Sequence, residues 1–462
     1  MDIGVQKSQD FLARYDAAAD SEKYPLVQRW IKTQPREFFK QLRQKRPVLV
    51  TPECVLVANF TDVRDLLSMP KVFTVDLYKP KMGVTDKDDG YLMAHDDDAL
   101  HYREKSLMQG LLNRNDLPRI RKMVAEAARQ ILSGAQGEIE LVNGYCRKVP
   151  VTLVQEYFGL DGIDQDDLVR WSYWNQYDAF NNQPFDNVSD SEYQQIVDQH
   201  DQATKELAAY IASLMIRKVL WVKLAGIFRM LWHPLRNFLY RIMARETPPN
   251  CDDMVSRMLR SRFAKEVDFP LVRVGVNAGG LLIGAIETTS QAVAQVVEYL
   301  LSNPPLLQNA KRLARQEDTS EFDAIVWEVL RFVPIRPDIF RQAGCDYTIA
   351  KGTRHETPIK AGTIVRLLIH SAMFDSYAYK DPDRFNPDRK LDHNFVFGYG
   401  SHECMGKYIG MEMIPEMVRQ VTLCNDLHAA TPISYRNTLF PERDGPFPEA
   451  YPLTWGRMSQ PD

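Results

Sequence analysis

Residues 397–406 read FGYGSHECMG, a glycine-rich loop with one cysteine just before a helical run, KYIGMEMIPEMVRQV (407–421). Gly398, Gly400 and Gly406 would let the backbone approach a bulky flat ligand, because they lack a Cβ. The free N–H groups at the start of the predicted helix would stabilise a thiolate at Cys404. The alternatives are a buried inert cysteine, or a nucleophile that would need a base such as His402. The loop alone leaves these interpretations open.

Upstream of this loop, the longest predicted helix runs from residue 268 to about residue 302. Asp268 can cap the helix, Pro270 suits its first turn, and Asn303-Pro304-Pro305 ends it. At about 1.5 Å per residue the helix would span roughly 50 Å. A helix of this length can cross a whole domain.

The middle of this helix, GLLIGAIETT (280–289), combines glycines and polar side chains with apolar residues. Gly280, Gly284 and Thr288 step by four residues and therefore share one face. A glycine inside a helix costs about 1 kcal/mol relative to alanine, so a compensating role is expected. Either a ligand approaches this face, or the helix kinks and its hydroxyls bond back to the preceding turn.

The segment EFDAIVWEVLRFVP (321–334) predicts a third helix of interest. Glu328 and Arg331 are three residues apart, so they can pair on one face. Exposed pairs of this kind contribute little to stability. The apolar neighbours of these two residues instead predict a constrained, buried pair.

Residues 211–245 form a basic and apolar stretch without an acidic residue. The charges interrupt it too often for a membrane-spanning helix, but they suit a helix that lies in a membrane interface. The alternatives are a helix pair packed on its own domain and a surface for an oligomer or a partner protein. The seven cations are Arg217, Lys218, Lys223, Arg229, Arg236, Arg241 and Arg245.

The composition is that of a soluble globular protein, since 45% of the 462 residues are hydrophobic and 26% are charged. It supports a large core and excludes a disordered, collagen-like or disulfide-stapled chain. The net charge of -4 gives no sign of nucleic-acid binding, which normally requires a basic excess. Six cysteines without a CxxC pair predict reduced thiols in a cytoplasm. The N-terminal segment has the pattern of neither a signal peptide nor a membrane anchor.

Short strands are expected near both ends of the chain. Residues 36–68 read as a helix, two strands and a helix, and residues 347–370 alternate around Gly352 and Gly362. Residues 76–98 are acidic and contain glycine, which is typical of a solvated loop or, in a functional interpretation, of a mobile lid.

The order of the motifs resembles that of a cytochrome P450: Glu-Thr-Thr on a long helix, then Glu-x-x-Arg, then Phe-x-x-Gly-x-x-x-Cys-x-Gly. The resemblance covers most of the chain and includes DALHYREK (98–105), RPDIFRQAG (336–344) and DPDRFNPDR (381–389). It implies a single large, mainly α domain with a small β-rich part. The implied α-rich part covers about 100–335 and the β-rich part about 36–75 and 336–390. The basic segment would be an insertion at about 215–245.

The resemblance implies a b-type haem between the long helix and the cysteine loop. Cys404 matches the axial thiolate ligand of the haem iron. Phe397 would pack beside this ligand. Room for the porphyrin is implied at Gly398, Gly406, Gly284 and Ala285.

The haem propionates imply a cluster of cations. Lys105 stands where the family usually has arginine, so a point charge replaces a bidentate fork. The matching positions are His101, Lys105, Arg341 and His402.

Two further pairs match family positions. Glu287 and Thr288 match the acid–alcohol pair that delivers protons to bound dioxygen in a dry pocket, with glutamate in place of the commoner aspartate. Glu328 and Arg331 match a structural ion pair that, with Arg384 or another nearby residue, locks the haem-side core.

The implied substrate pocket lies above the haem and is bounded by residues 76–98, 280–288 and 334–340 and by the turn near 444–451. Its apolar candidates are Leu77, Val84, Gly280, Leu281, Ile283 and Ile339.

The resemblance implies a monooxygenase that uses dioxygen on a small apolar organic substrate. No flavin motif or iron–sulfur spacing appears, so electrons are expected from a separate ferredoxin or flavodoxin and a reductase. The alternatives are a peroxide-driven or rearrangement catalyst on the same fold, and a haem-binding sensor, which would not need Glu287 and Thr288. The protein is expected in the cytoplasm, with residues 211–245 meeting the inner membrane, an acyl carrier or the protein's own core.

Overall fold

The computed structural model describes residues 10–186, 188–242, 253–261 and 269–456, and it describes side chains in these ranges except at 223–242. The α-helices are α1 Phe11–Ala17, α2 Asp20–Thr33, α3 Pro35–Lys45, α4 Phe60–Leu67, α5 Ala99–Leu111, α6 Leu117–Gly134, α7 Lys148–Leu153, α8 Gln165–Asn181, α9 Asp190–Ile242, α10 Met254–Ser261, α11 Leu271–Ala285, α12 Glu287–Leu301, α13 Pro304–Ala314, α14 Ser320–Phe332, α15 Ile369–Ala372 and α16 Lys407–Thr422. The strands are β1 Val48–Val50, β2 Val55–Val57, β3 Phe73–Thr74, β4 Glu138–Glu140, β5 Ile339–Ala343, β6 Tyr347–Ile349, β7 Thr357–Ile359, β8 Ile364–Leu367, β9 His428–Ala429 and β10 Pro452–Thr454.

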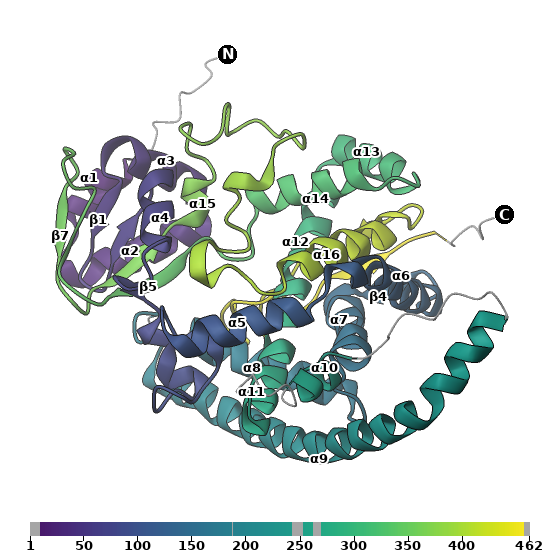
Figure 1. The fold of residues 1–462 in the computed structure, drawn as a ribbon. Coiled ribbons are helices and arrows are strands. Elements are labelled where there is room, and N and C mark those ends of the chain that lie inside the picture. The colour runs from purple at the N-terminus through teal and green to yellow at the C-terminus, as the bar shows by residue number, and fades with distance from the viewer. Residues whose placement is uncertain (1–9, 187, 243–252, 262–268, 457–462) are drawn as a thin grey trace.

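The β-rich part contains the strands expected near both ends of the chain. Its five-stranded sheet has the order β1-β2-β8-β5-β3, and β6 pairs with β7 in a separate hairpin. β2 and β8 are parallel, with Val55 opposite Val365, whereas the other neighbours in this sheet are antiparallel. Helices α1–α4 surround this part at the left of Figure 1. A second sheet, β4-β10-β9, was not predicted, because its short strands carry no clear alternation.

The long helix predicted from about 268 to 302 is two helices with a break. α11 ends at Ala285 and α12 begins at Glu287, and Ile286 between them has φ -87° and ψ -67°. Pro270 stands just before the first helical residue, and Asp268 lies outside the described residues. By length and composition alone, Leu271–Leu301 could cross a membrane, but 56% of its most apolar part is buried inside the protein. This burial is typical of a core helix.

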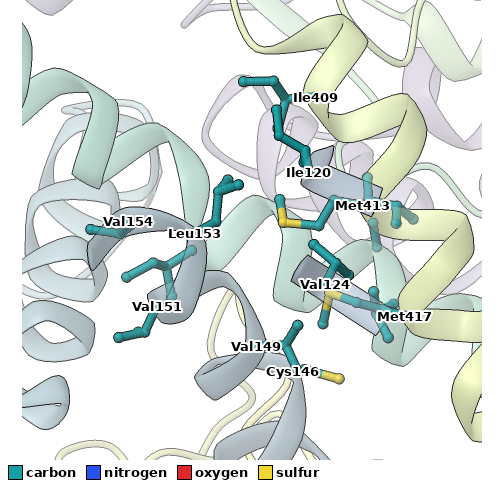
Figure 2. Close-up of a cluster of buried hydrophobic side chains, with 14 of the residues drawn as sticks. Ile120, Val124, Cys146, Val149, Val151, Leu153, Val154, Ile409, Met413 and Met417 are labelled. Carbon is teal, nitrogen blue, oxygen red and sulfur yellow. The ribbon is translucent and has the colours of Figure 1, made fainter. Parts of the chain in front are cut away.

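The helical core holds α6, α7 and α16 together. Ile120 and Val124 of α6 are buried in the same cluster as Met413 and Met417 of α16. Figure 2 shows these side chains facing each other across the two helices. The methionines fill this space as flexible apolar side chains, and α16 thereby holds the cysteine loop that precedes it.

Residues 76–98 are not a wholly solvated loop. They contain two 3-10 turns, at Asp76–Met82 and Leu92–Ala94, and Tyr78 and Leu92 are buried. The backbone oxygen of Gly90 accepts a hydrogen bond from Arg273 of α11 at 2.7 Å. The longest exposed run is 85–88, with Pro80 and Gly83 also exposed, so the expectation of a solvated loop is wrong at both ends.

Residues 190–242 form one uninterrupted helix, α9, so the alternative of a helix pair is wrong. In Figure 1 this helix runs along the lower edge of the molecule, and its C-terminal end extends beyond the neighbouring helices. The sequence places Pro248 and Pro249 after this helix, where they would end it, and both lie outside the described residues.

Candidate active site

The cysteine loop is shaped by its backbone. The Cys404 N–H donates to the Phe397 oxygen at 2.9 Å, which closes the loop. Gly400 has φ +71°, and a Cβ there would lie 2.7 Å from the backbone oxygen of Leu67. Any side chain at Gly400 would therefore strain the loop and collide with α4. The ring of Phe397 packs on Trp327 of α14 at 5.5 Å between centroids.

The thiol of Cys404 lies in a recess of the protein. Its side chain is exposed, yet desolvation by the surrounding protein raises its pKa, while the Gly406 backbone N–H and Lys105 oppose this rise. A side chain that is both accessible and desolvated lies in a deep opening, not on the outer surface. This environment supports the ligand interpretation over a buried inert cysteine.

The face of α11 and α12 that carries Gly284 and Thr288 has space beside it. A Cβ at Gly284 would meet no atom within 4 Å. The Thr288 hydroxyl donates to the Gly284 oxygen at 2.8 Å, next to the helix break at Ile286. The two interpretations of this face therefore coexist: the helix is interrupted and its hydroxyl bonds back, and the same face has room for a ligand.

Gly280 has a different role from Gly284. A Cβ at Gly280 would lie 2.0 Å from the ring of Tyr91. The missing side chain thus makes room for an aromatic residue of the 76–98 segment. Burial raises the pKa of Tyr91, with a contribution from the nearby Cys404. Tyr91 was missed in the sequence, because nothing in an acidic loop indicates which aromatic residue turns inward.

The carboxylate of Glu287 lies in a buried ion pair with Arg147. Arg147 Nε is 2.9 Å from Glu287 Oε1, and its Nη1 is 3.2 Å from Glu449 Oε2. Tyr173 donates to Glu449 at 2.5 Å. Burial raises the pKa of Glu287, and Arg147 opposes this rise. Arg147 and Glu449 were missed because they lie 140 residues before and 162 residues after Glu287.

The predicted propionate cations gather around the cysteine loop. His101 Nε2 lies 3.1 Å from the Ser401 oxygen, and Lys105 donates to the Glu403 oxygen at 2.9 Å. The rings of His101 and His402 are 4.9 Å apart. Burial lowers the pKa of His402 to about 2, and the charges of Arg341, His101 and Lys105 add to this shift. The four basic residues therefore lie close together beside the cysteine loop, and the imidazole of His402 is held in its neutral form.

Asp96 was assigned to the solvated acidic loop but belongs to this region. Its Oδ1 accepts from the Val75 N–H at 3.0 Å and lies 3.3 Å from His402 Nε2. Burial raises the pKa of Asp96 to about 6. Three consecutive aspartates at 96–98 gave no sign of which one would be buried.

A second buried network was also missed. Arg273 of α11 binds both oxygens of Glu104 of α5, at 2.6 and 2.7 Å, and Asn277 donates to Glu104 at 2.8 Å. Because Arg273 also binds the Gly90 oxygen, this network holds the segment that carries Tyr91 against α11.

The Glu328–Arg331 pair is buried, as predicted. Arg331 Nε and Nη2 bind the two Glu328 oxygens at 2.9 and 2.8 Å. Arg331 also donates to the backbone oxygens of Met373 and Pro382. The third charged residue is Arg389, which lies 3.4 Å from Glu328. The sequence suggested Arg384 for this place. In the structure the backbone oxygen of Arg384 accepts a hydrogen bond from Arg389.

The predicted pocket residues come from different parts of the core. Leu281 is buried in the helical core, and Ile283 and Ala285 pack against the same cluster. Leu77 and Ile339 pack in two clusters of the β-rich part. Val84 lies against Gly90, because a Cβ added at Gly90 would be 2.4 Å from Val84 Cγ2. These residues stay candidates for the substrate pocket.

Replacing Gly280 by alanine is expected to displace the Tyr91 ring and weaken substrate binding. Inserting a methyl group into a packed site typically costs about 1–3 kcal/mol of free energy. The loss is measured as a higher dissociation constant of a substrate that shifts the haem spin state. Gly279→Ala is the matched control, because its Cβ would meet Leu207 at an ordinary 3.9 Å. Equal affinities in the two variants would contradict the assigned contact between Gly280 and Tyr91.

The observed donor set fits a haem-thiolate group. An accessible thiol faces a recess, Gly284 leaves space on a helix face, and cations gather beside the cysteine loop. Thiolate, space and positive charge are what an iron porphyrin with two propionates requires.

Comparisons with known proteins identify the family of this chain. A family model described as Cytochrome P450 matches residues 176–421. The erythromycin C-12 hydroxylase of Saccharopolyspora erythraea is 26% identical over 79% of this chain and 80% of its own. The cyclomarin C epoxidase of Salinispora arenicola is 24% identical over 80% and 83%.

A solved cytochrome P450 from Chondromyces apiculatus shares the fold. It has a TM-score of 0.68 and 20% identity, over 92% of this chain and 96% of its own. The family model covers more than half of the sequence, and the matched region includes the Glu-Thr-Thr, Glu-x-x-Arg and cysteine-loop motifs. The chain therefore belongs to the cytochrome P450 family of haem-thiolate monooxygenases.

Proposed function

We propose that this protein hydroxylates or epoxidises a small apolar organic molecule above a b-type haem held by Cys404. In hydroxylation, a C–H bond and dioxygen are converted to C–OH and water, with two electrons and two protons from outside. The observation that supports this best is the Thr288 hydroxyl at the helix break, on the face that carries Gly284. The names of the relatives, a hydroxylase and an epoxidase, support the same reaction class.

The haem is proposed to be iron protoporphyrin IX, whose iron activates dioxygen. Cys404 would bind the iron, and Phe397, Gly398 and Gly406 would shape the loop beneath it. Gly284 and Ala285 would face the other side of the porphyrin. Its propionates would be bound by His101, Lys105, Arg341 and His402, which is consistent with the gathering of several basic side chains beside the cysteine loop. A reduced, carbon monoxide-bound absorption spectrum tests the thiolate, and an extracted-haem assay tests the haem type.

Thr288 is proposed to donate the proton on the substrate side, and Glu287 is the acid behind it. Arg147 holds Glu287 in a dry interior, so protons would come from the Arg147–Glu449 side. Each residue acts only on the proton supply, since the haem provides the oxidation chemistry.

Thr288→Ala is expected to uncouple the enzyme. Oxygen and reductant consumption should continue, while product per reductant consumed should fall at least about tenfold, because positioned proton donors typically contribute about 10²–10⁴. Thr289→Ala is the matched control, since Thr289 is the neighbouring threonine but is buried, whereas Thr288 is partly exposed. Unchanged coupling in the Thr288 variant, measured as product per NAD(P)H, would reject this role.

Electrons are proposed to come from a separate ferredoxin or flavodoxin and its reductase. Groups near the cysteine loop would form the docking surface: the Arg114 guanidinium lies 3.9 Å over the exposed Tyr408 ring, and the half-buried Lys407, which pairs with Glu403, is next to Tyr408 in the sequence. A peroxide-driven catalyst is the second candidate. Comparing turnover with peroxide against turnover with NAD(P)H and redox proteins separates the two.

The protein is proposed to be cytoplasmic. Residues 211–245 are proposed to contact a membrane surface or an acyl carrier, so that apolar substrates arrive close to the recess.

A further inference from the structure

The amphipathic pattern of α9 changes sides along its length. Up to Val222 the apolar side chains face the protein, since Leu214, Met215 and Val222 are buried. From Ile216 onward a second apolar set begins on the opposite side. Ile216, Leu220 and Trp221 are 67%, 57% and 66% exposed.

The helical period continues this exposed set to the end of α9. At about 100° per residue, one row of positions follows Leu220 at steps of three and four. This row consists of Leu220, Leu224, Ile227, Leu231, Leu235 and Phe238.

A second row beside the first starts at Trp221 and continues with Phe228 and Trp232. Together the two rows occupy an arc of about 160° of the helix. Between Val219 and Ile242 no charged residue falls within this arc. We call it the outward face of α9.

The side of α9 that packs on the protein up to Val222 carries cations further along the helix. Arg229 and Arg236 fall on the same side of the helix as the buried Lys218 and Val222. The row that begins at Leu220 therefore falls on the opposite side of the helix from these buried residues. In Figure 1 this end of α9 extends past the neighbouring helices.

Cations border the outward face on both sides. Lys223 and Arg241 fall along one edge and Arg229 and Arg236 along the other, and no acidic residue occurs between 207 and 245. Basic side chains at the edges of an apolar arc can reach anionic headgroups while their stems stay apolar. Tryptophan in such an arc suits the interfacial depth of a bilayer.

We propose that the outward face of α9, from Leu220 to Ile242, lies in the interface of an anionic lipid bilayer. The helix lies parallel to the membrane plane, since its cations follow both edges of the apolar arc along its length, from Lys223 to Arg241. An acidic carrier protein would be matched by cations within the contact surface, whereas here the centre of the arc is apolar. The inference extends the membrane contact of the proposed function and does not depend on the haem chemistry.

Vesicle flotation of the full-length, haem-loaded protein tests this proposal. Binding is expected to vesicles of phosphatidylcholine with phosphatidylglycerol, and to weaken with salt and without the anionic lipid. Leu220→Ser with Trp221→Ser should strongly reduce binding. Arg229→Gln with Arg236→Gln should weaken it about 30-fold, from about 1 kcal/mol per cation.

Val272→Ser is the matched control, because Val272 is also 67% exposed but belongs to α11. The carbon monoxide spectrum should be the same in all variants, which shows that the fold and haem are intact. Three results would overturn the proposal: no flotation with anionic vesicles at low salt, binding to an acyl carrier but not to vesicles, or dimers in light scattering that explain the exposed face.

Discussion

Replacing Cys404 by serine is expected to remove the thiolate signature from the reduced, carbon monoxide-bound spectrum and to abolish turnover. Serine cannot supply a thiolate to the iron, although it has nearly the same shape and keeps the loop hydrogen bond to Phe397. Loss of an outer-shell partner of a metal costs roughly 10–100-fold in affinity or activity. Loss of the ligand itself should cost more than this.

The matched control for Cys404 is Cys345→Ser, because Cys345 is also free and exposed but lies between β5 and β6. This variant should keep the wild-type spectrum and rate. A thiolate spectrum that survives Cys404→Ser would show that another cysteine binds the iron. Haem content, measured in both variants, separates a changed ligand from a failure to bind haem.

Glu328→Gln is expected to cause the largest loss of stability. The substitution leaves the Arg331 guanidinium buried without its carboxylate, and removing one partner of a buried pair costs about 3–5 kcal/mol. That is a large part of the roughly 5–15 kcal/mol that stabilises a typical protein. Arg331 also binds the Met373 and Pro382 oxygens, so the chain around residues 373–389 should loosen. The denaturation midpoint in urea, followed with haem retention, measures both effects.

The pair formed by Asp20 and Lys23 provides the control. Its two residues are three positions apart, as in the Glu328–Arg331 pair, and Lys23 Nζ lies 2.7 Å from Asp20 Oδ1. The Asp20 side chain, however, is 86% exposed, compared with 3% for Glu328. Asp20→Asn should leave the midpoint unchanged, since water screens the pair. Glu328→Leu combined with Arg331→Leu should recover part of the loss, because no buried charge remains. A Glu328→Gln midpoint equal to that of the wild type would contradict the structural role.

The local motifs were predictable because each is short and has a strong backbone requirement. Gly400 needs a positive φ next to α4, and Cys404 precedes a helix whose residues have a clear period. The Glu328–Arg331 pair was predictable from its spacing and apolar neighbours. The strands β6–β8 followed from their turns at Gly352 and Gly362.

The partners of these motifs were not predictable, since they come from distant parts of the chain. Arg147 binds Glu287 across 140 residues, and Tyr91 reaches Gly280 across 189. Local periodicity contains no information about which long-range pair forms. The single α9 helix in place of a helix pair also depended on packing, because its first half is buried against α8, α10 and α11.

The sequence by itself determined the family and the order of the site motifs along one domain, and it predicts Cys404 as the haem ligand. Their chemistry requires particular residue types at fixed local spacing, and such spacing can be read in one dimension. Only the tertiary structure decided the direction of Glu287, the purpose of Gly280 and the exposure of Ile216, Leu220 and Trp221 on α9. Each of these depends on which distant side chains fill the same space, and close packing settles that only when the chain is folded.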